Sequence, residues 1–305
     1  MHTGLRITVF AAALAATFGT AYGLGSTFGE ASPERKPTAH THVQGHDTSP
    51  PGGLHSSDGG YTLALKTPTV PAERDTGLRF SVVADSTGRS LTAYEPEHGK
   101  ELHLIVASRD LSVYRHLHPV RAADGTWSAS VDLPKATGYR VFADFTPRGG
   151  DGLTLGTDLT ATGPSTTSRT PAPHRTAHVD DYQVTLHGDL VPGRPGELTL
   201  TVTKDGEPVR DLEPYLEAYG HLVALRSGDL AYLHVHPNGE PGDATTRPGP
   251  DVSFTATAPS AGTYRLFLDF KHGGTVRTAA FTVQAAAAPA GAPDTHPENT
   301  AGHGH

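Results

Sequence analysis

The 305-residue chain contains 19 histidines, and six of them repeat one spacing twice. His116 and His118 are separated by a single residue, as are His234 and His236. Side chains two positions apart on a β-strand point to the same face, so each pair can offer two imidazole nitrogens to one ion. The proline after each pair ends the strand and leaves the pair at a sheet margin, where a metal ion can enter.

A third histidine precedes each pair at an interval that suits a hairpin. His103 stands 13 positions before His116, and His221 stands 13 positions before His234. This interval holds a strand, a short turn and a returning strand. We therefore expect three imidazoles to converge in each copy. Because each copy has its own set, we expect two independent sites with one ion each.

A carboxylate is the fourth candidate ligand in each copy. Asp144 and Asp269 lie in the repeated aromatic segments YRVFADF and YRLFLDF. In an immunoglobulin-like layout this strand neighbours the hairpin, so the carboxylate can bind the ion or accept a hydrogen bond from a ligating imidazole. A strand-end carboxylate bound only to backbone amides is the alternative. The predicted metal-site residues are His103, His116, His118, Asp144, His221, His234, His236 and Asp269.

The residue types narrow the choice of metal. The chain has no cysteine, and its single methionine is the initiator, so thiolate sites, disulfides and a blue-copper centre are excluded. Imidazole and carboxylate ligands suit Cu(II), Zn(II) and Ni(II), and Cu(II) has the highest affinity of these. Cu(II) is therefore the expected ion. Zn(II) is the alternative, and its open fourth position could activate water.

Short strands must position these ligands. Runs rich in aromatic and β-branched residues alternate with turn sequences: YTLALKT (61–67), LRFSVVAD (78–85), HLIVAS (103–108), WSASVDL (127–133) and YRVFADF (139–145). The second half repeats this plan, since HLVALRSGDLAYLHVHP (221–237) matches HLIVASRDLSVYRHLHP (103–119) without a gap. The predicted fold class is all-β, with two tandem immunoglobulin-like antiparallel β-sandwich domains after an N-terminal hydrophobic helix.

The segments between the strands complete the expected domain map. Residues 7–24 form an 18-residue apolar stretch, longer than the roughly 7–15 residues of a cleaved signal peptide and near the ~20 that span a bilayer. We expect residues 1–30 to be an uncleaved membrane anchor with the remainder outside the cytoplasm; a cleaved signal peptide and secretion are the alternative. The other predicted segments are a disordered stalk (31–60), the first sandwich (61–163), a linker (164–180), the second sandwich (181–284) and a disordered tail (285–305).

Two pairs of segments resemble the YtkA-like family of exported β-sandwich domains. They are HLIVASRDLSVYRHLHP with YRVFADFTP in the first copy, and HLVALRSGDLAYLHVHP with YRLFLDF in the second. The resemblance covers residues 61–163 and 182–284 and implies handling of copper and other heavy metals. The second copy lacks the proline after its aromatic strand and shifts its turn aspartate to Asp229.

Composition excludes several other functions. The net charge is −8 and the basic residues are scattered, so nucleic acid is not an expected partner. No Gly-rich phosphate loop, GxSxG or HExxH motif is present, and we expect no enzymatic activity. The predicted function is binding, buffering or delivery of a divalent metal, with a metal-transport partner that the sequence does not identify. An immunoglobulin-like interaction module with structural histidines, and a zinc-dependent hydrolase or metal oxygenase, are the alternatives.

Overall fold

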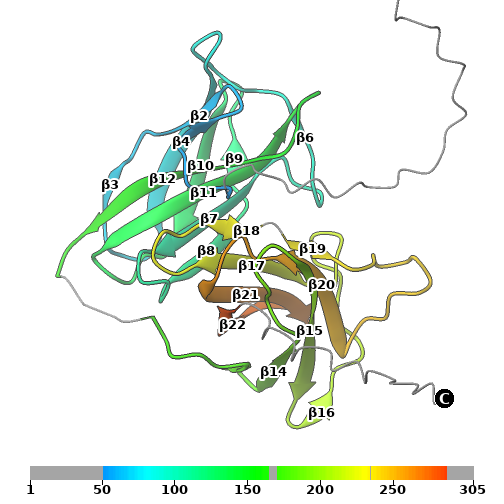
Figure 1. Cartoon of the computed structure of the whole chain (residues 1–305). Coiled ribbons are helices and arrows are strands. Elements are labelled where there is room, and N and C mark those ends of the chain that lie inside the picture. The colour runs from blue at the N-terminus through cyan, green and yellow to red at the C-terminus, as the bar shows by residue number, and fades with distance from the viewer. Residues whose placement is uncertain (1–50, 165–169, 234, 287–305) are drawn as a thin grey trace, which may run out of the picture. The chain divides into compact units, whose positions relative to one another are not determined.

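The computed structural model describes residues 51–164, 170–233 and 235–286, and all regular structure in these ranges is β (Figure 1). The all-β class and the two tandem sandwiches predicted from the sequence are confirmed. None of the described residues forms a helix that could cross a membrane. The predicted N-terminal hydrophobic helix lies outside the described residues.

Two sheets form the first sandwich. One sheet has the order β1 (Ser57–Asp58), β2 (Tyr61–Leu65), β4 (Thr76–Ala84), β10 (Thr126–Val131) and β9 (Val120–Arg121), with β5 (Arg89–Ser90) paired to β4. The other has the order β3 (Thr69–Pro71), β12 (Leu153–Thr162), β11 (Gly138–Pro147), β7 (His103–Ser108) and β8 (Tyr114–Leu117), with β6 (Tyr94–Glu95) paired to β11.

The second sandwich repeats this order. One sheet contains β13 (Thr176–Val179), β14 (Tyr182–His187), β15 (Pro195–Lys204), β20 (Asp251–Thr257) and β19 (Val235–Pro237), with β16 (Glu207–Pro208) paired to β15. The other contains β18 (Tyr232–Leu233), β17 (His221–Arg226), β21 (Gly262–His272) and β22 (Thr275–Ala285). In the first copy β2, β4 and β10 share one sheet, and β7, β11 and β12 share the other. In the second copy β14, β15 and β20 are likewise separated from β17, β21 and β22. This division of the strands between two sheets is that of the immunoglobulin fold.

Alternating side chains build one apolar core in each sandwich. In β4, Leu78, Phe80 and Val82 are fully buried, whereas Gly77 before Leu78 and Arg79 after it are exposed. In β15 the inward positions are again buried leucines and a valine. Each core is closed by the aromatic strand of the facing sheet, β11 or β21.

A third apolar cluster joins the two sandwiches, which belong to one compact unit. Tyr114 stacks on Phe267 with ring centroids 4.0 Å apart, and its counterpart Tyr232 packs on Phe142 at 5.8 Å. Equivalent residues therefore exchange places across the contact, as at an interface with two-fold symmetry. The cluster consists of Ile105, Ala107, Leu111, Tyr114, Phe142, Val223, Leu225, Leu230, Tyr232 and Phe267. This contact explains why β7 is buried on both faces and reads as an unbroken apolar run.

The predicted stalk ends earlier than expected, because residues 51–60 are folded. The Tyr232 amide donates to the Gly52 carbonyl, and the Gly53 amide donates to the Thr154 carbonyl. Gly53 has a φ of 74°, and a Cβ on it would lie 2.5 Å from the Phe142 ring. Glycine serves close packing here instead of flexibility. The predicted linker is also shorter, since β13 lies within 164–180 and pairs with β14.

The inter-sandwich cluster makes a stability prediction. Phe267→Ala removes a buried ring that stacks on Tyr114, and we expect a loss of about 3–5 kcal/mol in the free energy of unfolding. Val276→Ala, at a partly exposed position on the adjacent strand, is the control and should cost under about 1 kcal/mol. Urea unfolding of both variants measures the difference, and equal losses would show that the ring contributes nothing to stability.

Candidate metal centre

His103, His116 and His118 converge at the end of the β7–β8 hairpin. The antiparallel register places His116 opposite Ile105, so both face the same side of the sheet as His103. One nitrogen from each of the three side chains lies within 4.8 Å of the others. The three ring centroids are 4.9, 5.3 and 5.4 Å apart. The convergence predicted for the first copy is therefore present.

The outer nitrogens of two of these rings are committed as hydrogen-bond donors. His103 Nε2 donates to the Glu97 carbonyl oxygen at 3.1 Å, and His116 Nδ1 donates to Asp269 Oδ2 at 2.8 Å. Carbonyl and carboxylate oxygens only accept, so in the neutral rings these nitrogens carry the protons. The facing atoms, His103 Nδ1 and His116 Nε2, then both present lone pairs at 3.1 Å. A cation between them would turn this repulsion into binding.

The third ring supplies a nitrogen without a partner. His118 Nε2 is buried and has no hydrogen bond among the described residues. A buried polar atom left unpaired costs about 1–3 kcal/mol, which a bound ion would recover. Metal–imidazole bonds of about 2.0–2.1 Å place the nitrogens of a tetrahedral site about 3.3 Å apart. The 3.1 Å between the facing nitrogens of His103 and His116 is close to this spacing.

Burial keeps the candidate ligands in the form that binds metal. Desolvation lowers the pKa of His118 to about 3, and the neighbouring His116 and His103 lower it further in the same direction. Burial also lowers the pKa of His103, with His116 as the next cause. Both rings are therefore neutral at pH 7, and neutral imidazole is the metal-ligating species.

Asp269 of the second sandwich contacts a histidine of the first. Its Oδ2 accepts from His116 of the first sandwich at 2.8 Å, and its Oδ1 accepts from the Thr278 hydroxyl at 2.5 Å. The side chain is only 4% exposed. The expectation of two independent sites with one ion each stays a prediction, but it did not include this contact between the first cluster and a carboxylate of the second sandwich.

Asp144 lies opposite His103 in the β7–β11 ladder but is bonded elsewhere. Its Oδ1 accepts from the Thr154 hydroxyl at 2.8 Å, and its Oδ2 accepts from the Tyr232 hydroxyl of the other sandwich at 3.3 Å. Burial raises the pKa of Tyr232 well above 10, with the charge of Asp144 as the next cause. The contacts show Asp144 joining the two sandwiches, and its role as a ligand stays a prediction.

The second histidine set is only partly described. His221 is buried, and its Nε2 donates to the carbonyls of Tyr215 and Leu216, both at 2.9 Å. Burial lowers its pKa to about 4, with the charge of His98 as the next cause. His234 and the side chain of His236 lie outside the described part of the chain. Convergence of this second set therefore stays a prediction.

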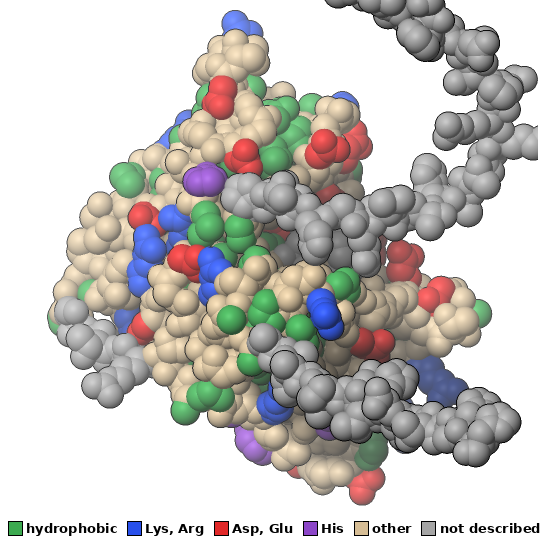
Figure 2. All heavy atoms as spheres, viewed as in Figure 1, with side chains coloured by type: hydrophobic (Ala, Val, Ile, Leu, Met, Phe, Trp, Pro, Cys, Tyr) green, Lys and Arg blue, Asp and Glu red, His purple; other side chains and the backbone are tan. Residues whose placement is uncertain are grey.

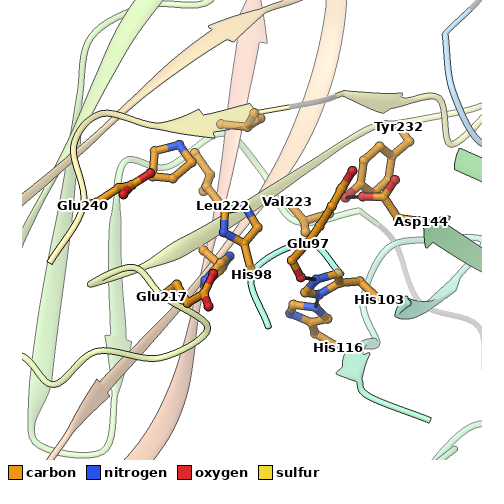
Figure 3. Close-up of a pocket in the computed structure, with 13 residues that line it drawn as sticks. Glu97, His98, His103, His116, Asp144, Glu217, Leu222, Val223, Tyr232 and Glu240 are labelled. Carbon is orange, nitrogen blue, oxygen red and sulfur yellow. Dashed lines mark hydrogen bonds between the residues drawn. The ribbon is translucent and has the colours of Figure 1, made fainter. Parts of the chain in front are cut away.

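A cavity of about 400 Å³ opens beside the cluster and receives side chains from both sandwiches (Figure 3). Its polar lining consists of Glu97, His98, His103, His116, Asp144, Glu217, His221, Tyr232 and Glu240. His98 and Glu217 were not predicted from the sequence. The repeat could not indicate them, because the position equivalent to His98 is Leu216 and the position equivalent to Glu217 is Gly99.

The lowered histidine pKa values predict acid sensitivity of the metal-free protein. In the unfolded chain His118 titrates near ~6.5, whereas in the folded protein its pKa is about 3. The unfolded state therefore binds the proton first, and folding stability should be full above pH 7 and fall as pH drops from about 6.5 towards 3. Urea midpoints measured with a chelator between pH 8 and 5 test this. His118→Asn should show a shallower decline, and an unchanged slope would contradict the assignment.

Known proteins supply a family and distant structural likenesses. The D00-D0 domain of intimin is 10% identical, and the match covers 73% of this chain and 99% of the intimin chain with a TM-score of 0.22. The Ig1-2 module of the Drosophila receptor protein tyrosine phosphatase DLAR is 9% identical, and the match covers 74% of this chain and 98% of the module with a TM-score of 0.20. The chicken CNTN1 FN1-FN3 domains are 12% identical, and the match covers 78% of this chain and 66% of those domains with a TM-score of 0.20. No curated protein matches the chain significantly. The model of a domain of unknown function, DUF8832, matches residues 55–163 and again residues 177–287. The chain therefore belongs to the DUF8832 family and contains two tandem copies of its domain.

Proposed function

We propose that this protein binds a divalent metal ion at His103, His116 and His118, and that it buffers or delivers that ion outside the cytoplasm. The observation that carries the proposal is the convergence of one nitrogen from each of three imidazoles to within 4.8 Å of one another. The facing nitrogens of His103 and His116 both present lone pairs at 3.1 Å, and His118 Nε2 is buried and unpaired among the described residues.

Copper(II) is the proposed ion, with Zn(II) as the alternative. Three imidazoles without a sulfur ligand suit both ions, and Cu(II) lies above Zn(II) in the affinity order for such a site. The resemblance of the histidine hairpins to the YtkA-like family supports copper as well. The match to a domain of unknown function carries no information on the metal.

Asp269 supports the proposal as an orienting residue. A metal-bound imidazole commonly donates its other N–H to a carboxylate, which fixes the tautomer and strengthens the ligand. The His116 Nδ1 to Asp269 contact of 2.8 Å has this arrangement. Because the carboxylate comes from the second sandwich, the packing of the two domains determines the quality of the site.

Three protein nitrogens leave a coordination position open on the ion. An open position allows the ion to be transferred to a ligand of another molecule. The cluster borders the cavity of about 400 Å³, so an incoming ligand of a partner or chelator can approach the ion from that side. The same opening favours zinc-assisted hydrolysis as a second candidate function, because an open zinc position can hold and activate water. Turnover of a simple ester by the zinc-loaded protein, lost in His118→Ala, would support that second candidate.

Features away from the site bear on location and partners. The apolar stretch at 7–24 supports an exported protein anchored in the membrane by its N-terminal segment, with secretion after cleavage as the alternative. On the face shown in Figure 2, lysine and arginine side chains are intermixed with aspartate and glutamate. This distribution does not favour nucleic acid as a partner.

Substitution of one ligand tests the proposal directly. His118→Ala should abolish tight Cu(II) binding at the first cluster, because one of three nitrogens is removed. His178→Ala, which replaces an exposed histidine on β13, is the matched control and should leave this binding unchanged. Competition titration with a chelator of known affinity separates tight binding from weak surface binding. Equal affinity in both variants would sink the three-histidine site.

The orienting carboxylate has a separate test. Asp269→Asn keeps the shape of the side chain but weakens the hydrogen-bond acceptor for His116. The variant should still bind one equivalent of Cu(II), with an affinity about 10–100-fold lower. Asp181→Asn, at an exposed position of the same sandwich, is the control. If Asp269→Asn binds Cu(II) as tightly as the control variant, the carboxylate has no influence on the site.

A further inference from the structure

We propose that a second divalent cation binds between the two sandwiches, at His98 from the first and His221 and Glu217 from the second. This position lies beside the three-histidine cluster. It differs from the site expected within the second copy alone, because one of its ligands comes from the first sandwich. The inference deepens the proposed function and rests on it, since both positions would take the same class of ion.

The spacing of the two rings matches that of the first cluster. The ring centroids of His98 and His221 are 5.0 Å apart, within the 4.9–5.4 Å range of the His103, His116 and His118 rings. Two imidazoles that share an ion through bonds of about 2.0–2.1 Å need a spacing of this size. The separations of His103 from His98 and from His221 are longer, at 6.3 and 6.5 Å.

The free nitrogens are available for an ion. His221 donates through Nε2 to two backbone carbonyls, so in the neutral ring Nδ1 holds the lone pair. The cavity is lined by both His221 and His98. No hydrogen bond joins the His98 ring to any residue in the described ranges. Nothing in that part of the chain therefore competes with an ion for His98.

A carboxylate lies beside His98. Glu217 lines the same cavity, and its Oε1 lies 3.6 Å from the position of a Cβ on Gly99, directly after His98. Figure 3 shows Glu217 near His98 on the side away from His103. Among the described residues, the cavity lining contains the carboxylates Glu97, Asp144, Glu217 and Glu240 and neither lysine nor arginine. A cavity with this charge attracts cations.

The position of His98 also gives the two sites a connection. Its ring centroid is 6.3 Å from that of His103 and 5.0 Å from that of His221, and the centroids of His103 and His221 are 6.5 Å apart. The two positions are therefore close enough for ions bound at both to be magnetically coupled. We infer that the second position, with two imidazoles instead of three, is the weaker one.

Copper titration of the full chain, followed by electron paramagnetic resonance, tests the inference. A chelator that removes weakly bound copper is present throughout. One equivalent should give the spectrum of an isolated Cu(II) ion. Two equivalents should bind, and the second should produce the half-field signal of magnetically coupled neighbouring ions. His178→Ala is the control and should behave as the wild type.

Two variants remove the second position without disturbing the fold. His98 has a φ of 48°, which asparagine tolerates, so His98→Asn is preferred to alanine. Glu217→Gln keeps the size of its side chain. In His98→Asn the bound copper should fall from two equivalents to one and the coupling signal should vanish. Glu217→Gln should weaken the second equivalent at least tenfold and leave the first unchanged.

The other outcomes separate this inference from the proposed function. A single ion in the wild type that is lost in His118→Ala and kept in His98→Asn would overturn the second position and leave the proposed function intact. A single ion lost in His98→Asn and kept in His118→Ala would overturn the three-histidine site instead. Two ions with coupling that survives His98→Asn but not His236→Ala would assign the second ion to one domain and overturn the inference.

Discussion

The contact between the two histidine-bearing sheets determines what the histidines can do. Tyr114 stacks on Phe267, and Tyr232 packs on Phe142, so the sheets meet face to face through aromatic rings. At one margin of this contact the carboxylate of Asp269 reaches His116. Without the apolar contact that carboxylate would face water, and the tautomer of His116 would no longer be fixed. The chemistry of the site is thus a property of the pair of domains.

Burial between the sheets also explains the protonation of the site. The histidines are largely desolvated by burial, so the charged imidazolium is disfavoured and the pKa values of His103, His118 and His221 are lowered. The cost of this arrangement appears as unpaired polar atoms, such as His118 Nε2 and the Tyr114 hydroxyl, among the described residues. Unpaired buried groups of this kind cluster at functional sites, where a ligand supplies what the chain does not.

The strand pattern and the internal repeat predict most of the fold and part of the site. Side chains two positions apart on a strand share a face, and this period is visible in the sequence. It appears in the alternating apolar residues of LRFSVVAD and in the HxHP spacing. They predict the convergence of His103, His116 and His118. The partnership of Asp269 with His116 could not be predicted, because a repeat comparison assigns each residue to its own copy. His98 and Glu217 were missed for a different reason, since leucine and glycine stand at their equivalent positions in the other copy.

The exchange of equivalent residues across the contact has a consequence for how such a chain can change over time. A single domain of this type that paired with itself would form a homodimer in which every substitution occurs twice. Covalent fusion of the two copies removes that restriction. One copy can then carry a histidine at position 98 while the other carries leucine at the matching position 216, with the aromatic contacts between them preserved. The tandem arrangement thus allows an asymmetric cavity to arise from a symmetric joint, one residue at a time.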